Sequence, residues 1–175
     1  MIYVFFCGAQ SGRIKELLVT AGGENVAPVP VENYIKEQCP ALSQAIMIGD
    51  KKKYCSMLVS IACKTDKEEN PTSDLEAHAK LVNTNVSTVE EAMNDPVWHQ
   101  YIRDGIKKYN ADKSICVSNS CKIQYFQILH KDLSVADGTL SASQKLKRHK
   151  LQDVYKDELE ALYGDKPSVA VNPRR

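Results

Sequence analysis

Two adjacent glycines and a nearby arginine make residues 12–28 the part of this sequence best suited to contact a ligand. Arg13 carries a planar guanidinium that can bind a phosphate or a carboxylate through two parallel hydrogen bonds. Gly22 and Gly23 can adopt positive φ angles, and they let a ligand approach the bare main chain. From the residues alone, the same pattern also fits a β-hairpin that carries surface charges.

A lysine near the carboxyl end can act as a movable positive charge. Lys145 follows the loop Asp137-Gly-Thr-Leu-Ser-Ala-Ser-Gln144, whose glycine gives the backbone conformational freedom. Such a side chain can bring a point charge to a distant partner and withdraw it again. Two other interpretations stay open, because residues 145–150 also fit the solvated start of a basic helix or a nucleic-acid-binding patch.

A third group of charges consists of Lys51, Lys52 and Lys53. They separate the apolar runs 45–48 and 57–61, so the pattern predicts a β-hairpin with a basic tip. This tip could contact phosphates, although a basic turn is usually only solvated. The four histidines lack metal-ligand spacing and no Cys-x-x-Cys occurs, so we expect no metal site and reduced, buried thiols in a cytosolic protein.

The elements that position these residues predict an α+β domain, a small sheet of about three strands flanked by several helices. Prolines 28 and 30 precede a short helix with an apolar face, and Pro96 begins a longer helix with an amphipathic stripe that ends at Tyr109. Residues 122–129 read as a strand. A final helix from Leu151 is expected to end at Gly164.

The sequence predicts three segments along the chain. Residues 1–11 form an atypical N-terminal segment, residues 12–163 form the domain, and residues 164–175 are expected to be a disordered tail. Within the domain, residues 64–95 read as a polar and helical insertion. Two capping-box patterns, Ser73-x-x-Glu76 and Ser87-x-x-Glu90, each predict the start of a short helix there.

Composition and charge narrow the function classes. The 23 basic and 22 acidic residues leave a formal net charge of +1, so no global field attracts nucleic acid or an anionic membrane. No window approaches the roughly 20 apolar residues of a membrane span. We therefore expect a soluble or peripheral protein with no nucleic-acid partner.

Residues 12–26 read Gly-Arg-Ile-Lys-Glu-Leu-Leu-Val-Thr-Ala-Gly-Gly-Glu-Asn-Val. This segment resembles the junction motif of the AMP-forming acyl-CoA synthetases, especially the bubblegum-type long-chain enzymes. The resemblance continues in order through Ile48-Gly49-Asp50-Lys51, Ser118-Asn119, Lys122-Ile-Gln124 and Lys145-Leu-Lys-Arg148. It covers residues 12–163 and implies the C-terminal lid domain of such an enzyme.

The resemblance implies a two-step reaction with fatty acid, ATP with Mg²⁺, and CoA as substrates. The fatty carboxylate attacks the α-phosphate of ATP, and the CoA thiol then attacks the acyl-adenylate and releases AMP. The family's phosphate-binding loop is absent from these residues, so we expect the chain to act with an N-terminal adenylation domain outside them. The chain would then be a truncated product, an alternative-start isoform or an isolated domain. The related enzymes imply the cytoplasm, with peripheral association at the endoplasmic reticulum.

The resemblance also assigns roles to single residues. Arg13 matches the arginine that contacts the nucleotide near its ribose, and Lys15 matches the hinge about which the domain turns. Lys145 matches the lysine that bridges the substrate carboxylate and the α-phosphate, and Lys147 takes this role if the alignment slips by two residues. The loop that lines the pantetheine tunnel corresponds to Thr20, Ala21, Gly22, Gly23 and Glu24. The resemblance does not assign the basic tip of Lys51, Lys52 and Lys53, which could contact the CoA phosphates or be a solvated turn.

Gln144 departs from the family pattern, because many members have glycine immediately before this lysine. Because the phosphate-binding loop is absent from these residues, two alternatives to a ligase lid stay open. One is a noncatalytic nucleotide-binding or CoA-binding regulatory module, and the other is an interaction domain that uses its basic patch.

Overall fold

A mixed four-stranded sheet with the spatial order β10-β9-β6-β5 forms the centre of the computed structural model. The structure describes residues 3–6, 10–13, 17–164 and 169–172, with side chains from residue 17 onward except that of Gln152. The strands β5 and β6 form an antiparallel hairpin, and β9 pairs with β6 in parallel. Their bounds are β5 (Leu42–Ile48), β6 (Cys55–Ile61), β9 (Ile123–Ile128) and β10 (Val169–Ala170).

The predicted α+β class is confirmed, and the three long strands are those that the sequence predicts. The fourth strand, β10, lies in the segment for which the sequence predicts disorder. It pairs with β9 in antiparallel fashion, and the next residue, Val171, is fully buried. A short pairing and one buried valine therefore give residues 169–171 a place in the fold that their composition does not indicate.

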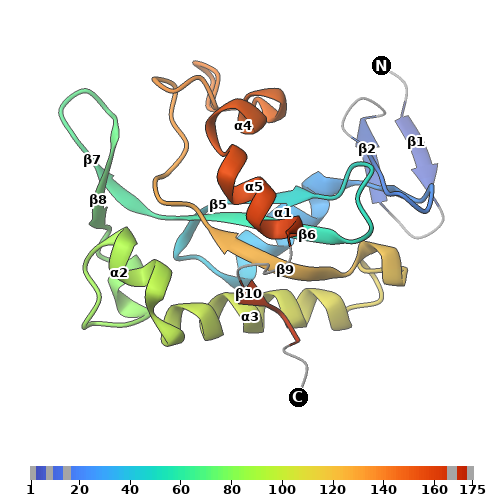
Figure 1. Cartoon of the computed structure of the whole chain (residues 1–175), viewed down its shortest axis with the longest axis horizontal. Coiled ribbons are helices and arrows are strands. Elements are labelled where there is room, and N and C mark those ends of the chain that lie inside the picture. Colours follow the sequence, from blue (N-terminus) through green and yellow to red (C-terminus); the bar gives the residue numbers. More distant parts are fainter. Residues whose placement is uncertain (1–2, 7–9, 14–16, 165–168, 173–175) are drawn as a thin grey trace.

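Helices cover both faces of this sheet (Figure 1). The helices α1 (Pro28–Gln38) and α3 (Pro96–Ala111) lie on one face, and α4 (Arg148–Val154) and α5 (Lys156–Tyr163) lie on the other. Each face of the sheet has its own hydrophobic core. Neighbouring residues of β5 point to opposite faces, since Met47 belongs to one core and Ile46 to the other. Every residue of β6 is buried, as expected for a strand between two helical layers.

The predicted helix after Pro96 is confirmed. Asp95 caps α3 by accepting a hydrogen bond from the Trp98 backbone N at 2.9 Å. Most of the predicted stripe is buried, with no exposed surface at Trp98, Ile102, Ile106 or Tyr109, and Tyr101 is partly buried. These side chains attach α3 to the sheet.

The single final helix that the sequence predicts is instead broken at Tyr155, which has φ −120° and ψ 40°. Its ring is completely buried, and its hydroxyl donates weakly, at 3.5 Å, to the carbonyls of Lys131 and Asp132. The break lets both Leu151 of α4 and Leu162 of α5 enter the same core. Tertiary packing therefore overrides the local helical pattern.

The polar insertion contains a second hairpin that the sequence does not predict. Strands β7 (Cys63–Thr65) and β8 (Pro71–Leu75) project from one end of the molecule (Figure 1), so Ser73 lies in a strand and starts no helix. A short 3₁₀ turn, η2 (Ala79–Leu81), follows. The second predicted helix exists as α2 (Val89–Asn94), but its capping box is Thr88 with Glu91, one residue later than predicted.

The opposite end of the molecule carries the ribbon of β1 (Tyr3–Phe6) and β2 (Gln10–Arg13) (Figure 1). Among the described residues, no helix is long and apolar enough to cross a membrane. The described cysteines are buried and free, as predicted, at Cys39, Cys55, Cys63, Cys116 and Cys121. Burial raises the pKa of the Cys55 thiol to about 12, so this thiol stays protonated at neutral pH.

We expect Gly105→Ala to destabilise the protein although alanine favours helices. A Cβ at position 105 would overlap Cys39 Sγ, which lies just beyond the end of α1. Overpacking costs about 1–3 kcal/mol, against a gain in helix propensity of about 1 kcal/mol. Urea titration should show a lower free energy of unfolding, and Cys39→Ala in the same chain should remove most of the loss. A higher free energy of unfolding for Gly105→Ala alone would contradict this packing.

Candidate functional site

The double-glycine segment forms a tight hairpin loop between β3 (Leu18–Val19) and β4 (Asn25–Val26). The backbone N of Thr20 donates to the Glu24 carbonyl at 3.0 Å, and the Gly23 N donates to the Thr20 carbonyl at 2.9 Å. The Thr20 hydroxyl accepts from the Glu24 N at 3.3 Å, inside the loop. Gly23 has φ 79°, which explains why glycine suits this position.

The lysine turn between β5 and β6 is attached directly to this loop. The Val19 N donates to Asp50 Oδ1 at 3.1 Å, and the Lys51 N donates to the Val19 carbonyl at 2.7 Å. The Ala21 N donates to the Lys52 carbonyl at 3.0 Å. Two segments that the sequence treats separately thus lie together, residues 20–24 with residues 50–53, and we call them the paired-loop surface. All of these residues are exposed except Thr20, which is buried.

One edge of the paired-loop surface is fixed by Ser118, whose hydroxyl donates to Glu24 Oε2 at 2.7 Å. Ser118 directly precedes the short 3₁₀ turn η3 (Asn119–Cys121). Glu24 therefore has a structural partner in addition to the role that the resemblance implies. The residues Ala21, Gly22 and Gly23 remain exposed.

A groove of about 760 Å³ lies between the lysine turn and the helices α4 and α5. Lys52 Nζ lies 4.7 Å from the centre of the Tyr163 ring, in a cation–π contact. The Tyr163 ring stacks on Tyr54 at 5.2 Å, and its hydroxyl donates to the Ile48 carbonyl at 3.0 Å. Burial raises the pKa of Tyr163 well above its ordinary value. Sequence reasoning assigned no role to Tyr54 or Tyr163, because their pairing depends on contacts that are distant in sequence.

Lys145 lies in another hairpin, residues 140–146, which is separate from the paired-loop surface and which we call the Lys145 hairpin. Leu140 and Leu146 form an isolated antiparallel bridge, and the Ser141 N donates to the Lys145 carbonyl at 2.9 Å. The Lys145 side chain is exposed, and among the described residues its ammonium has no ion-pair partner. The alternative residue, Lys147, is also exposed, and its backbone N donates to the Thr139 carbonyl at 2.8 Å.

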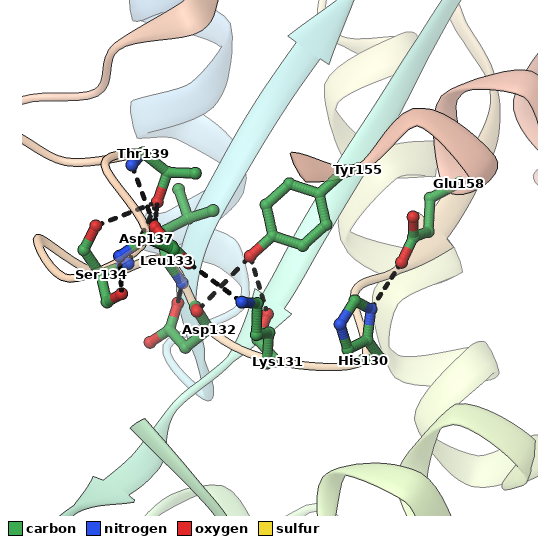
Figure 2. A network of polar contacts seen from close by, with 9 residues as sticks. All are labelled: His130, Lys131, Asp132, Leu133, Ser134, Asp137, Thr139, Tyr155 and Glu158. Atoms are coloured by element: carbon green, nitrogen blue, oxygen red, sulfur yellow. Dashed lines mark hydrogen bonds and ion pairs between the residues drawn. The ribbon is translucent and has the colours of Figure 1, made fainter. Parts of the chain in front are cut away.

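A buried polar network supports the first limb of this hairpin (Figure 2). The Thr139 hydroxyl donates to Asp137 Oδ1 at 2.5 Å and accepts from the Ser134 N at 3.1 Å. Lys131 Nζ lies 3.4 Å from the other oxygen of Asp137. Burial alone raises the pKa of Asp137, but the Thr139 hydrogen bonds and the Lys131 cation lower it overall. The carboxylate therefore stays charged at neutral pH.

The segment after β9 is fixed to the sheet by Asp132. Its Oδ1 accepts hydrogen bonds from the hydroxyls of Ser43 and Ser60, both at 2.6 Å. Ser43 and Ser60 belong to β5 and β6. The loop that carries the network of Figure 2 is thus attached to the rigid centre of the fold.

Two predicted site residues are not placed in full. Lys15 lies outside the described residues, and only the backbone of Arg13, at the end of β2, is described. The described polar contacts of the paired-loop surface are with Val19, Gly49, Ser118 and Tyr163. Those of the Lys145 hairpin are with residues 134–141. The site residues therefore form two surfaces, each held by its own contacts.

We expect Gln144→Gly to stabilise the Lys145 hairpin. Gln144 has φ 58°, a region that costs a residue with a side chain about 1–2 kcal/mol. Glycine relieves this cost but loses more chain entropy on folding, so the net gain should be about 0.5–1 kcal/mol in the free energy of unfolding. Gly138→Ala, at φ 78°, is the control and should lower stability. A loss of stability with Gln144→Gly would contradict this account.

Comparison with known proteins identifies the class of this domain as the C-terminal domain of adenylate-forming enzymes. A family model described as the AMP-binding enzyme C-terminal domain matches residues 15–124. The chain belongs to this family.

Similar proteins indicate which enzymes of this family the chain is related to. The chain is 38% identical over 162 residues to the long-chain-fatty-acid–CoA ligase ACSBG2 of Xenopus laevis, covering 89% of this chain and 22% of that ligase. The ligase ACSBG1 of Mus musculus matches with the same identity and coverage. The chain is thus homologous to the bubblegum ligases and spans about one fifth of their length.

Solved structures support the fold. The adenylation domain of a carboxylate reductase from Mycobacterium chelonae superposes with a TM-score of 0.61 at 24% identity, over 88% of this chain and 20% of that one. The A domain of the carboxylic acid reductase from Segniliparus rugosus, solved with AMP and a carboxylic acid, gives 0.60 at 21% identity, over 87% and 20%. The architecture described above is therefore that of the matching part of adenylation domains.

Proposed function

We propose that the chain serves as the C-terminal lid of a long-chain fatty acid–CoA ligase. The observation that carries the proposal is the exposed Lys145 on a hairpin whose base is held by buried polar contacts. A cation on a hairpin that is held in this way can approach a reaction centre built by another domain without prior reorganisation of the hairpin. The homology to bubblegum ligases supplies the reaction class.

In the proposed adenylation step, the fatty carboxylate attacks the α-phosphate of ATP and pyrophosphate leaves. Two anions must approach each other, and the Lys145 ammonium offsets the negative charge that develops between them. ATP enters with Mg²⁺, and both are bound mainly by the adenylation domain. Arg13 is proposed to contact the nucleotide near its ribose, and Lys15 to act as the hinge.

In the proposed second step, the domain turns and presents the paired-loop surface. The CoA thiol loses its proton to solvent and its sulfur bonds to the acyl carbonyl carbon, and AMP leaves with the electrons of the broken bond between that carbon and the phosphate oxygen. The residues that lack bulk, Gly22 and Gly23, would line the passage of the pantetheine arm. The exposed lysines Lys51, Lys52 and Lys53 would meet the CoA phosphates, since they lie on the same surface as these glycines.

A fusion enzyme tests the proposal. The complete chain is joined to the adenylation region of ligase ACSBG2 of Xenopus laevis, in place of the segment that it matches. We expect fatty-acid-dependent exchange of pyrophosphate with ATP, and acyl-CoA formation when CoA is added. The adenylation region alone and the chain alone are the controls.

Failure of the fusion to exceed both controls would contradict the ligase role. CoA or nucleotide binding by the chain without any turnover would instead support the noncatalytic regulatory module. Binding of nucleic acid that falls steeply with salt would support the basic-patch domain.

We place the protein in the cytoplasm, with peripheral association at the endoplasmic reticulum membrane. Long-chain fatty acids partition into membranes because of their apolar area, so a ligase that uses them meets its substrate at a lipid surface. Cosedimentation of the fusion enzyme with vesicles that contain fatty acid checks this placement, and equal recovery in the supernatant with and without vesicles would contradict it.

A further inference from the structure

An ion pair joins α1 to the first residue of α4. Arg148 Nη2 lies 2.6 Å from Glu32 Oε1 and 2.7 Å from Glu32 Oε2. The Glu32 side chain is 11% exposed and that of Arg148 is 27% exposed, so solvent screens this pair less than a surface pair. The contact links segments that are 116 residues apart in the sequence.

Both partners also bind the backbone of β5 at Met47. The Met47 N donates to Glu32 Oε1 at 2.8 Å, and Arg148 Nη1 lies 3.4 Å from the Met47 carbonyl. The strand β5 is the edge of the four-stranded sheet. The ion pair therefore occupies the position that a further strand would take, and it fixes α4 to the sheet at this point.

The same arginine ends the Lys145 hairpin. Arg148 lies three residues after Lys145 and directly after Lys147, whose N is bound by the Thr139 carbonyl. The first limb of the hairpin is held by the network of Ser134, Asp137 and Thr139 (Figure 2). The second limb has Arg148 as its anchor, so the exposed Lys145 lies between two fixed points.

We infer that Glu32 and Arg148 are positioning residues for adenylate formation, and that they act by fixing the limb that carries Lys145. This inference rests on the proposed function. The pair touches no reacting atom, and it acts on the reaction through the placement of the lysine. The hydrogen bonds that join residues 20–24 to residues 50–53 do not include this ion pair, so we expect the second half-reaction to depend on it less than adenylation does.

The fusion enzyme with Glu32→Gln tests this inference. Glutamine keeps the shape and the acceptor for the Met47 N but removes the charge. Since a displacement of about 1 Å can cost about 10²-fold, we expect kcat of adenylation to fall about 10- to 100-fold while KM for ATP changes less than about threefold. Thioester formation from supplied acyl-adenylate should change less than about threefold. Arg148→Lys, which keeps the charge but not the planar group, should behave in the same way.

Glu158→Gln is the matched control. Glu158 of α5 lies 2.6 Å from His130 Nδ1 and its side chain is 15% exposed, so its loss removes a comparable contact at the start of the loop of Figure 2, outside the second limb of the Lys145 hairpin. It should leave the ratio of the two half-reactions unchanged. If Glu32→Gln lowers both half-reactions equally, or only as much as Glu158→Gln does, the pair serves folding alone and the inference is wrong.

A measurement on the complete chain without the adenylation region separates this inference from the ligase proposal. In hydrogen exchange, Glu32→Gln should speed exchange of the amides of residues 141–147 at least tenfold, while the β6 amides and the Glu158→Gln protein stay unchanged. Unchanged protection in residues 141–147 would overturn the positioning role. If the fusion enzyme with the wild-type chain is inactive, the ligase proposal is contradicted. The exchange result would still show whether Glu32 and Arg148 fix the Lys145 hairpin.

Discussion

Replacing Lys145 with alanine should lower the rate of acyl-adenylate formation in the fusion enzyme by about 10²- to 10³-fold. The side chain is exposed and has no ion-pair partner among the residues that the structure places, so its loss should leave the free energy of unfolding unchanged. The cation acts where charge develops on the transferring group, and no other ammonium on this hairpin occupies the same position. Pyrophosphate exchange and urea titration of the same preparation measure both effects.

Lys147→Ala is the control that decides the alignment. Its backbone is bound to Thr139, and its side chain is exposed as that of Lys145 is. We expect less than about a tenfold effect on adenylation, well below that of the preorganised cation. A larger loss with Lys147→Ala than with Lys145→Ala would move the catalytic role by two residues. Equal activity of the Lys145→Ala and wild-type fusions would remove a lysine of this hairpin from the mechanism.

Gly22→Val should block thioester formation and spare adenylation. A Cβ at position 22 meets only the Thr20 hydroxyl at 3.9 Å, so the domain itself can accept a side chain there. In the proposed second step the same position lines the pantetheine passage, where added bulk excludes the thiol from its place beside the acyl carbonyl. We expect a loss of about 10²-fold or more in acyl-CoA formation from supplied acyl-adenylate.

The matched measurement is pyrophosphate exchange by the same Gly22→Val protein, which should stay within about threefold of wild type if only the second half-reaction depends on the loop. Gly22→Ala should give an intermediate loss. Position 23 is unsuited to this test, because its φ of 79° would add backbone strain to any steric effect. Equal loss of both half-reactions would show that Gly22 supports the fold or the hinge and lines no passage.

The regular elements could be predicted because their signals are local. The helix after Pro96 has a proline start, an aspartate cap and a long apolar stripe, and the β5–β6 hairpin has two apolar runs around a charged turn. The break at Tyr155 has no local signal, since leucines 151, 159 and 162 continue the helical pattern across it. Tertiary packing of the Tyr155 ring decides that point, and so does the pairing that gives β10 its place.

The site shows the same division. The lysine turn and the double-glycine loop could each be identified, but their contact joins Val19 to Asp50 across 31 residues, and no spacing in the sequence reveals it. Glutamate 32 reads as an ordinary helix surface residue, and its partner Arg148 as one charge in a basic run. The substitution of Gln144 for the glycine common in the family is visible in the sequence, and the structure gives its physical meaning through a φ of 58°.

The parallel pairing of β6 with β9 has a consequence for how the chain folds. It pairs Cys55 with Ile123, so the residues of α2 and α3 lie within the long loop that this pairing closes. Closing such a long loop is entropically costly, and topologies rich in distant contacts fold slowly. During synthesis the β5–β6 hairpin therefore emerges well before its neighbour. Until Ile128 has left the ribosome, one side of the most deeply buried strand remains unpaired and is the surface that a chaperone would protect.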